Sequence, residues 1–124
     1  MGTPSDDRVY GVRTVDTLGE DLYLIAGRIL SDLKADQAEG NLPGNAVIVT
    51  AVQGSTITVQ AHVVHTHQGE PADRTAIRSR ALTVMDRYNW IGKKNRHDVR
   101  FTPSVTVRYV RSRLDAASLG SVIG

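Results

Sequence analysis

Two β-strands joined by a tight turn constrain this chain more than any other feature of its sequence. Residues 46–53 form a β-prone run, and residues 56–63 alternate strictly between apolar and polar side chains. A period of two predicts a strand with one buried face and one solvated face. Gly54-Ser55, which separates the two runs, is a two-residue connection with glycine first, as a type II′ turn requires. The sequence therefore predicts a β-hairpin with one polar face.

An amphipathic helix is expected before this hairpin. Apolar side chains recur at spacings of three and four over residues 17–38, which is typical of a helix with one buried face. Asp16 or Thr17 is the expected N-cap, because a short side-chain oxygen can accept from the first helical N–H groups. Gly40 is the expected C-terminal stop, since glycine tolerates the left-handed conformation found there.

A second helix and a third strand are expected after the hairpin. The helix should start at Pro71 or Asp73 and should end at residues 89–92, whose glycine would cap it. The strand should cover residues 99–110. Pro103 lies within this strand and lacks an N–H group, so an edge position or a bulge is expected there.

The order helix, strand, strand, helix, strand predicts a two-layer α+β fold, with the helices packed on one face of a small antiparallel sheet. A length of 124 residues fits one domain. We expect a flexible leader with a possible short strand over residues 1–14 and a single domain over residues 15–111. A short helical or frayed tail is expected over residues 112–124.

The composition excludes several classes of protein. The chain has no cysteine, which rules out disulfides, thiolate zinc sites and a cysteine nucleophile and is typical of a reducing cytoplasm. No run of about 18 apolar residues is present, so no membrane span is expected. The first residues also lack the basic and then apolar pattern of a signal peptide. We therefore expect a cytoplasmic protein that does not associate with a membrane.

Several short motifs resemble one of the large-polyvalent-protein-associated domains of bacteriophages and mobile elements. The resemblance is carried by residues 54–59, 88–89 and 98–101, with Val105 behind them, and spans about residues 17–107. It implies the same order of helices and strands, and a phage or mobile-element protein that acts inside a bacterial host. It brings no catalytic residue. Members of the family usually continue after the Tyr-Asn pair with acidic residues and serines, whereas this chain has a basic loop.

Catalytic signatures are missing from the sequence. No nucleophile elbow surrounds any serine, and the glycines do not have the spacing of a phosphate-binding loop. His62, His65 and His67 could supply three imidazoles to a metal ion, and three solvent-exposed histidines fit the same spacing. We expect a non-enzymatic protein without a cofactor.

Basic residues gather in the second half of the chain. Residues 1–64 carry four Lys or Arg against eight Asp or Glu, whereas residues 65–124 carry eleven against five. Clustered cations can neutralise phosphates and release counterions, and a tryptophan beside them can stack on an unpaired base. The candidate nucleic-acid-binding residues are Trp90, Lys93, Lys94, Arg96, Arg100 and Arg108.

A protein partner is the alternative. An open edge strand and a polar sheet face can dock a protein, and the acidic first helix could approach a basic surface. The sequence therefore leaves two functions open: a binding module that contacts nucleic acid, and a phage protein that binds and antagonises a host protein as an anti-defence or host-takeover factor. Arginines on the third strand would repel a second copy, so we expect a monomer or a small homo-oligomer.

Overall fold

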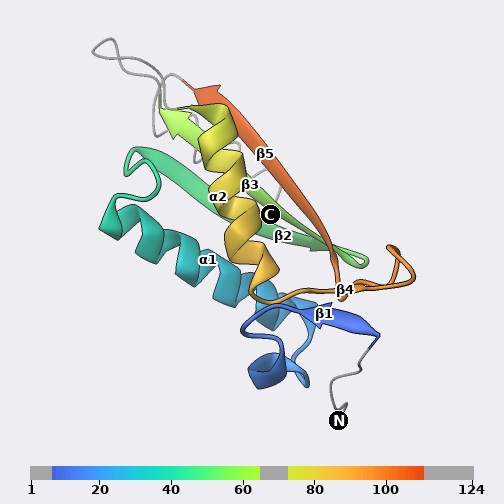
Figure 1. The fold of residues 1–124 in the computed structure, drawn as a ribbon. Helices are drawn as coiled ribbons and strands as arrows, with labels where there is room; N and C mark the ends of the chain where they lie inside the picture. The colour runs from blue at the N-terminus through green and yellow to red at the C-terminus, as the bar shows by residue number, and fades with distance from the viewer. Residues whose placement is uncertain (1–6, 65–72, 111–124) are drawn as a thin grey trace.

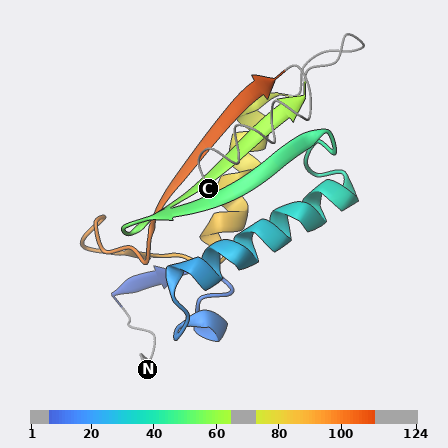
Figure 2. The same cartoon turned by 180° about the vertical axis from the view of Figure 1, so that it is seen from behind.

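Two helices lie against one face of a three-stranded sheet in the computed structural model, which describes residues 7–64 and 73–110 (Figure 1). Figure 2 shows the opposite sheet face, which neither helix covers. The predicted two-layer α+β fold is therefore confirmed. The elements are α1 (Leu22–Glu39), α2 (Arg74–Asp86), β2 (Ala46–Gln53), β3 (Thr56–Val64) and β5 (Thr102–Val110).

The sheet is mixed, and β3 is its central strand. β2 pairs with β3 antiparallel, whereas β5 pairs with β3 parallel, with Val59 opposite Val105. The parallel pairing differs from the wholly antiparallel sheet that the sequence predicted. The reason is that α2 carries the chain back along the sheet, so that β5 starts at the same end as β3. The edge position predicted for the strand that contains Pro103 is confirmed.

The hairpin and the core follow the predicted alternation. Gly54 has a φ of 59° while Ser55 keeps a negative φ, which is the type II′ pattern. On the helix-facing side of β3, Ile57, Val59 and Ala61 are at most 2% exposed. They pack with aliphatic residues from both helices and with the aromatic rings of Tyr88 and Phe101. The helical part of this core is formed by Ile25, Ala26, Ile29, Leu33, Ile77, Ala81, Val84 and Met85.

The first helix begins later than the sequence predicted. Its N-cap is Asp21, whose Oδ1 accepts from the Leu24 N–H at 2.9 Å, rather than Asp16 or Thr17. A separate 3₁₀ turn, η1 (Val15–Thr17), occupies the predicted start. Thr17 donates its hydroxyl to the Arg13 carbonyl at 2.7 Å, and such local bonds compete with helix formation. Gly40 has a φ of 84° and ends α1 as predicted.

The second helix is shorter than predicted. Asp73 is its N-cap, as one of the two expected starts. The helix ends at Asp86, and the predicted cap region is instead a strand, β4 (Trp90–Gly92). β4 pairs antiparallel with β1 (Arg8–Tyr10), which confirms the short N-terminal strand. β5 begins three residues later than expected, and the predicted C-terminal helix lies outside the described residues.

An ion pair joins the two helices at the edge of the core. Asp36 on α1 is 4% exposed and accepts two hydrogen bonds from Arg80 on α2, at 2.7 and 2.9 Å. The Arg80 guanidinium holds the pKa of the Asp36 carboxyl below its usual value, against the opposing effect of burial. A carboxyl with a lowered pKa stabilises the folded state above its unfolded pKa and loses this contribution as the pH falls.

Replacing Asp36 with Asn should lower the free energy of unfolding at neutral pH by about 1.5–3 kcal/mol, since hydrogen bonds to a charged group are lost. Chemical denaturation of both proteins between pH 2 and pH 8 provides the measurement. The difference should be constant above about pH 5 and should shrink below about pH 4, as Asp36 of the parent protein becomes protonated. A difference that does not change with pH would contradict this role for the ion pair.

Candidate nucleic-acid interface

A basic loop projects from the small β1–β4 ribbon at one end of the molecule. Ile91 of β4 forms a bridge with Val99, and the loop between them carries the predicted cations. Arg8 on β1 anchors the loop through two hydrogen bonds to Asp98, at 2.8 and 2.9 Å. The Arg8 guanidinium also holds the pKa of the Asp98 carboxyl below its usual value. The base of the loop is therefore fixed to the ribbon.

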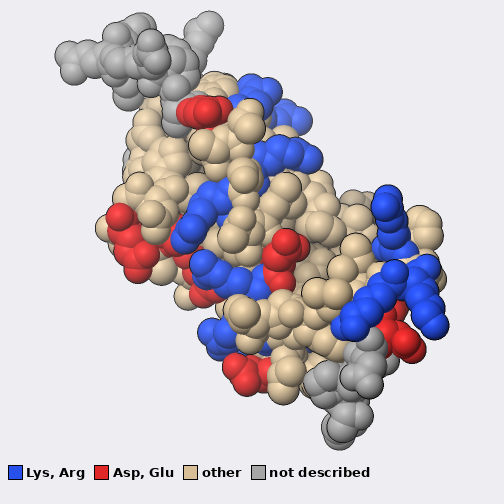
Figure 3. Space-filling view, in the orientation of Figure 1, with Lys and Arg blue, Asp and Glu red and all other residues tan. Residues whose placement is uncertain are grey.

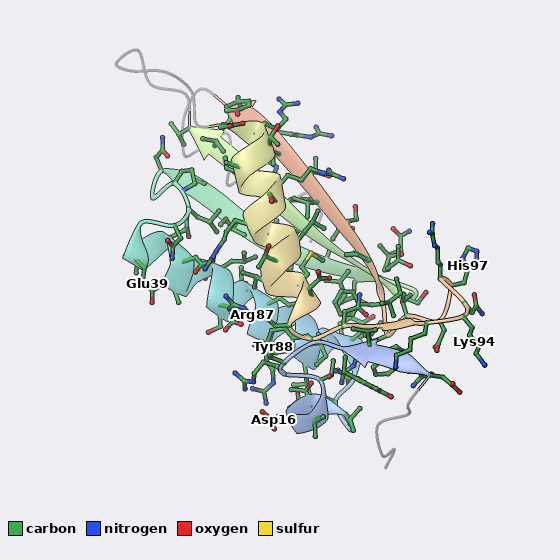
Figure 4. All side chains as sticks on the ribbon, viewed as in Figure 1. Asp16, Glu39, Arg87, Tyr88, Lys94 and His97 are labelled. Atoms are coloured by element: carbon green, nitrogen blue, oxygen red, sulfur yellow. The ribbon has the colours of Figure 1, made fainter. Side chains whose placement is uncertain are left out.

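The three cations of this loop are available to a ligand. Lys93, Lys94 and Arg96 are all exposed, and none of them forms an ion pair with a residue that the structure describes. Figure 4 shows Lys94 and His97 projecting outward from the loop. Five of the nine other described arginines have a carboxylate partner, whereas the loop cations, Lys93, Lys94 and Arg96, have none among the described residues and form an exposed basic surface.

A second group of cations lies toward the other end of β5, with Arg108 on one face of the strand and Arg74 and Arg78 on the helix side. Arg108 is exposed on the sheet face that the helices leave open, as predicted. Arg74 on α2 lies over the Tyr109 ring at 5.2 Å, and Arg78 donates to the Val105 carbonyl at 2.7 Å. Figure 3 shows basic side chains gathered over α2 and β5 and, separately, over the loop. At ~3.3 Å per residue, Arg108 is roughly 20 Å from the start of β5.

Arg100 is not part of either group, contrary to the prediction that it faces water. Its guanidinium donates to the Thr17 hydroxyl at 2.8 Å and to the Tyr88 carbonyl at 3.1 Å, and it also contacts the Thr17 carbonyl. Burial lowers the pKa of Arg100 from its usual value. Arg100 precedes β5, so the alternation of that strand does not set its direction. Its contacts connect η1 to the end of α2.

Trp90 also has protein contacts that the sequence did not reveal. The Arg8 guanidinium lies 4.5 Å from the centre of its ring, and that of Arg100 lies at 5.5 Å. The Tyr10 ring is tilted against it at a centroid distance of 6.0 Å. The indole that was predicted to stack on a base therefore already contacts two cations of the protein.

A groove lies between the ribbon, the end of α2 and the start of β5, with a volume of about 360 Å³. Figure 3 shows this hollow between the body of the molecule and the lobe that carries the loop cations. Val9 and Ile91 are opposite each other in the ribbon and are 56% and 45% exposed. The groove is lined by these two residues and by Tyr10, Gly11, Asp86, Asn89, Trp90, Val99 and Pro103.

The histidines and the acidic helix contribute less to a binding surface than their sequence suggested. His62 is 1% exposed, and its burial lowers its pKa, with a smaller effect from Arg108. His65 and His67 lie outside the described residues. Among the residues that are described, no three potential metal ligands come together.

Two carboxylates of α1 are engaged within the protein. Asp36 pairs with Arg80, and Asp32 accepts from the Tyr88 hydroxyl at 2.7 Å and from Arg87 at 3.3 Å. Figure 4 shows Arg87 and Tyr88 where the end of α2 meets α1. Burial, followed by this hydrogen bond, raises the pKa of Tyr88 to about 12. These acids therefore hold the helices together, which leaves fewer of them to approach a basic partner.

Comparison of this chain with protein-family models, curated proteins and solved structures gave no match. In the part of the chain that the structure describes, neither helix is both long enough and apolar enough to cross a membrane. The assignment of the candidate interface therefore depends on the positions and contacts of its residues alone.

Proposed function

We propose that this protein is a non-enzymatic binding module that contacts nucleic acid through the loop cations and along β5. The observation that carries the proposal is the exposure of Lys93, Lys94 and Arg96 without carboxylate partners among the described residues. Lys and Arg side chains in such positions bind phosphates and release their counterions.

The second cation group supports the same proposal. Arg74, Arg78 and Arg108 lie along β5 at a distance from the loop that several consecutive phosphates could span. Arg78 uses one nitrogen for the Val105 carbonyl, which leaves its other N–H groups for a ligand. Arg74 and Arg78 belong to α2 and were not among the predicted contact residues. Arg100, which was predicted to contact nucleic acid, is instead bonded within the protein.

Replacing Lys93, Lys94 and Arg96 together with Ala should weaken binding to nucleic acid and reduce its salt dependence. Each lost phosphate contact lowers the log–log salt slope by ~0.7 on a single strand and ~0.9 on a duplex, so a decrease of about 2–3 is expected in total. Fluorescence anisotropy of labelled oligonucleotides across a series of salt concentrations gives this slope.

The matched control replaces Arg13, Arg28 and Lys34 with Ala. This variant loses the same formal charge, but its residues lie around α1, and two of them already pair with Asp16 and Glu20. Its salt slope should remain that of the parent protein. Equal effects of the two triple variants would show that only net charge matters, and an absence of binding to any DNA or RNA at low salt would refute the proposal.

The setting we propose is the cytoplasm of a bacterium that carries a bacteriophage or mobile element, as the resemblance of residues 54–59 and 98–101 suggests. The second candidate function is antagonism of a host protein. The edge strands β2 and β5 favour it, because an edge strand can pair with a strand of another protein. Recovery of a discrete partner from bacterial lysate after nuclease treatment would support this candidate over nucleic-acid binding.

A further inference from the structure

We infer that the groove between the ribbon and the end of α2 holds one unpaired guanine base of a single-stranded nucleic acid. This inference rests on the proposed function and specifies which form of nucleic acid the protein prefers. Its basis is the combination of apolar walls, the exposed acidic residue Asp86 in the lining, and cations on the loop that adjoins the groove.

The walls of the groove suit the face of a base. Ile91, Val99 and Pro103 supply aliphatic surface from three separate segments, and the exposed Val9 extends it. A volume of about 360 Å³ lies within the range of small-ligand sites. A base stacked within a duplex cannot enter such a groove without being extruded, whereas a base of a single strand can.

Asp86 in the lining of the groove favours a ligand that donates hydrogen bonds. Asp86 is exposed and forms no ion pair with any residue that the structure describes. It is also the last residue of α2, where the helix dipole places partial negative charge. An ionised carboxylate only accepts hydrogen bonds. Guanine presents two adjacent donors, N1–H and the N2 amino group, on its Watson–Crick edge, whereas thymine and uracil present one.

The basic loop next to the groove favours binding of the phosphates that flank the base. Ile91 and Val99 line the groove and also form the bridge from which the basic loop projects. A base in the groove therefore brings its flanking phosphates toward Lys93, Lys94 and Arg96. The negative charge of Asp86 disfavours a phosphate inside the groove itself, so the two charges orient the nucleotide with its base inward.

The experiment uses the full chain and short oligothymidylates that carry one central guest base. The protein contains a single tryptophan, and it lines the groove, so Trp90 fluorescence reports occupation directly. The guanine-containing strand should bind about 10-fold more tightly than the all-thymine strand, because guanine can donate one more hydrogen bond to the charged carboxylate of Asp86. The corresponding duplex should bind more weakly than either single strand.

Two exposed residues test the groove with little risk to folding. Asp86→Asn should bring the ratio of guanine to thymine affinity close to one, because the amide offers a donor where the carboxylate only accepts. Ile91→Ser should lower the same ratio, because it removes part of the apolar surface that contacts the base. The matched control is Leu24→Ser, since Leu24 on α1 is 58% exposed and does not line the groove, and this variant should keep the parent ratio.

The outcomes separate this inference from the proposed function. If the oligonucleotides bind with the expected salt dependence but the guest base makes no difference, the groove inference is wrong and the proposed function stands. If Asp86→Asn keeps the full guanine preference, the carboxylate is not the reading group and the inference is again overturned. If no oligonucleotide binds at low salt, both proposals fail together.

Discussion

Replacing Asn89 with Ala should lower the free energy of unfolding by about 3–5 kcal/mol. Asn89 is 9% exposed, and its side-chain oxygen accepts from the backbone N–H groups of Trp90, Arg100 and Phe101 at 3.0–3.2 Å. Its side-chain nitrogen donates to the Phe101 carbonyl at 3.0 Å. Alanine leaves the buried N–H and carbonyl of Phe101 and two partly buried N–H groups without their side-chain partner, and each unsatisfied buried group costs about 1–3 kcal/mol.

Urea denaturation followed by circular dichroism measures this loss, and hydrogen exchange locates it. Exchange should accelerate most over residues 90–101, where the Asn89 side chain holds β4 beside the segment that leads into β5. The control is Asn41→Ala, because Asn41 is exposed and its nearest acceptors are 3.3 and 3.5 Å away; its effect should stay within about 0.5 kcal/mol. Similar losses for the two variants would contradict the role assigned to Asn89.

Replacing Gly11 with Ala should destabilise the protein by about 2–4 kcal/mol, through overpacking against rigid backbone. A Cβ atom at Gly11 would lie 1.9 Å from the Asp86 carbonyl oxygen and 2.7 Å from the Arg87 carbonyl. The chain must move away, and it would weaken the hydrogen bond from the Gly11 N–H to the Asn89 carbonyl, now 2.8 Å long. Thermal unfolding measures the effect.

Gly27→Ala is the matched control for this substitution. Nothing lies within 4 Å of a Cβ atom placed at Gly27, which is exposed within α1. Alanine has the higher helix propensity, so this variant should gain about 0.5–1 kcal/mol. Opposite signs for the two variants are expected, and a stabilised Gly11→Ala protein would show that the N-terminal segment is not packed against the end of α2.

Elements with a local signal could be predicted from the sequence alone. The alternation of residues 56–63 and the Gly54-Ser55 turn identified the hairpin, because strand periodicity and a positive φ are properties of a few adjacent residues. The helical periodicity of residues 17–38 identified α1, although its start moved to Asp21. The exposed loop cations were identifiable for the same reason, since a run of Lys and Arg after a glycine is seldom buried.

Contacts between segments far apart in the chain could not be predicted from local patterns and became visible in the folded structure. Residues 90–92 are too few to show a strand periodicity, and they became β4 because β1, about 80 residues earlier, supplies the partner strand. Arg100 turned inward because Thr17 and Tyr88 offer it acceptors. The groove exists only where three such segments meet. Local patterns specify which residues can form a helix or a strand, and the pairing of distant segments specifies which side chains remain exposed to a ligand.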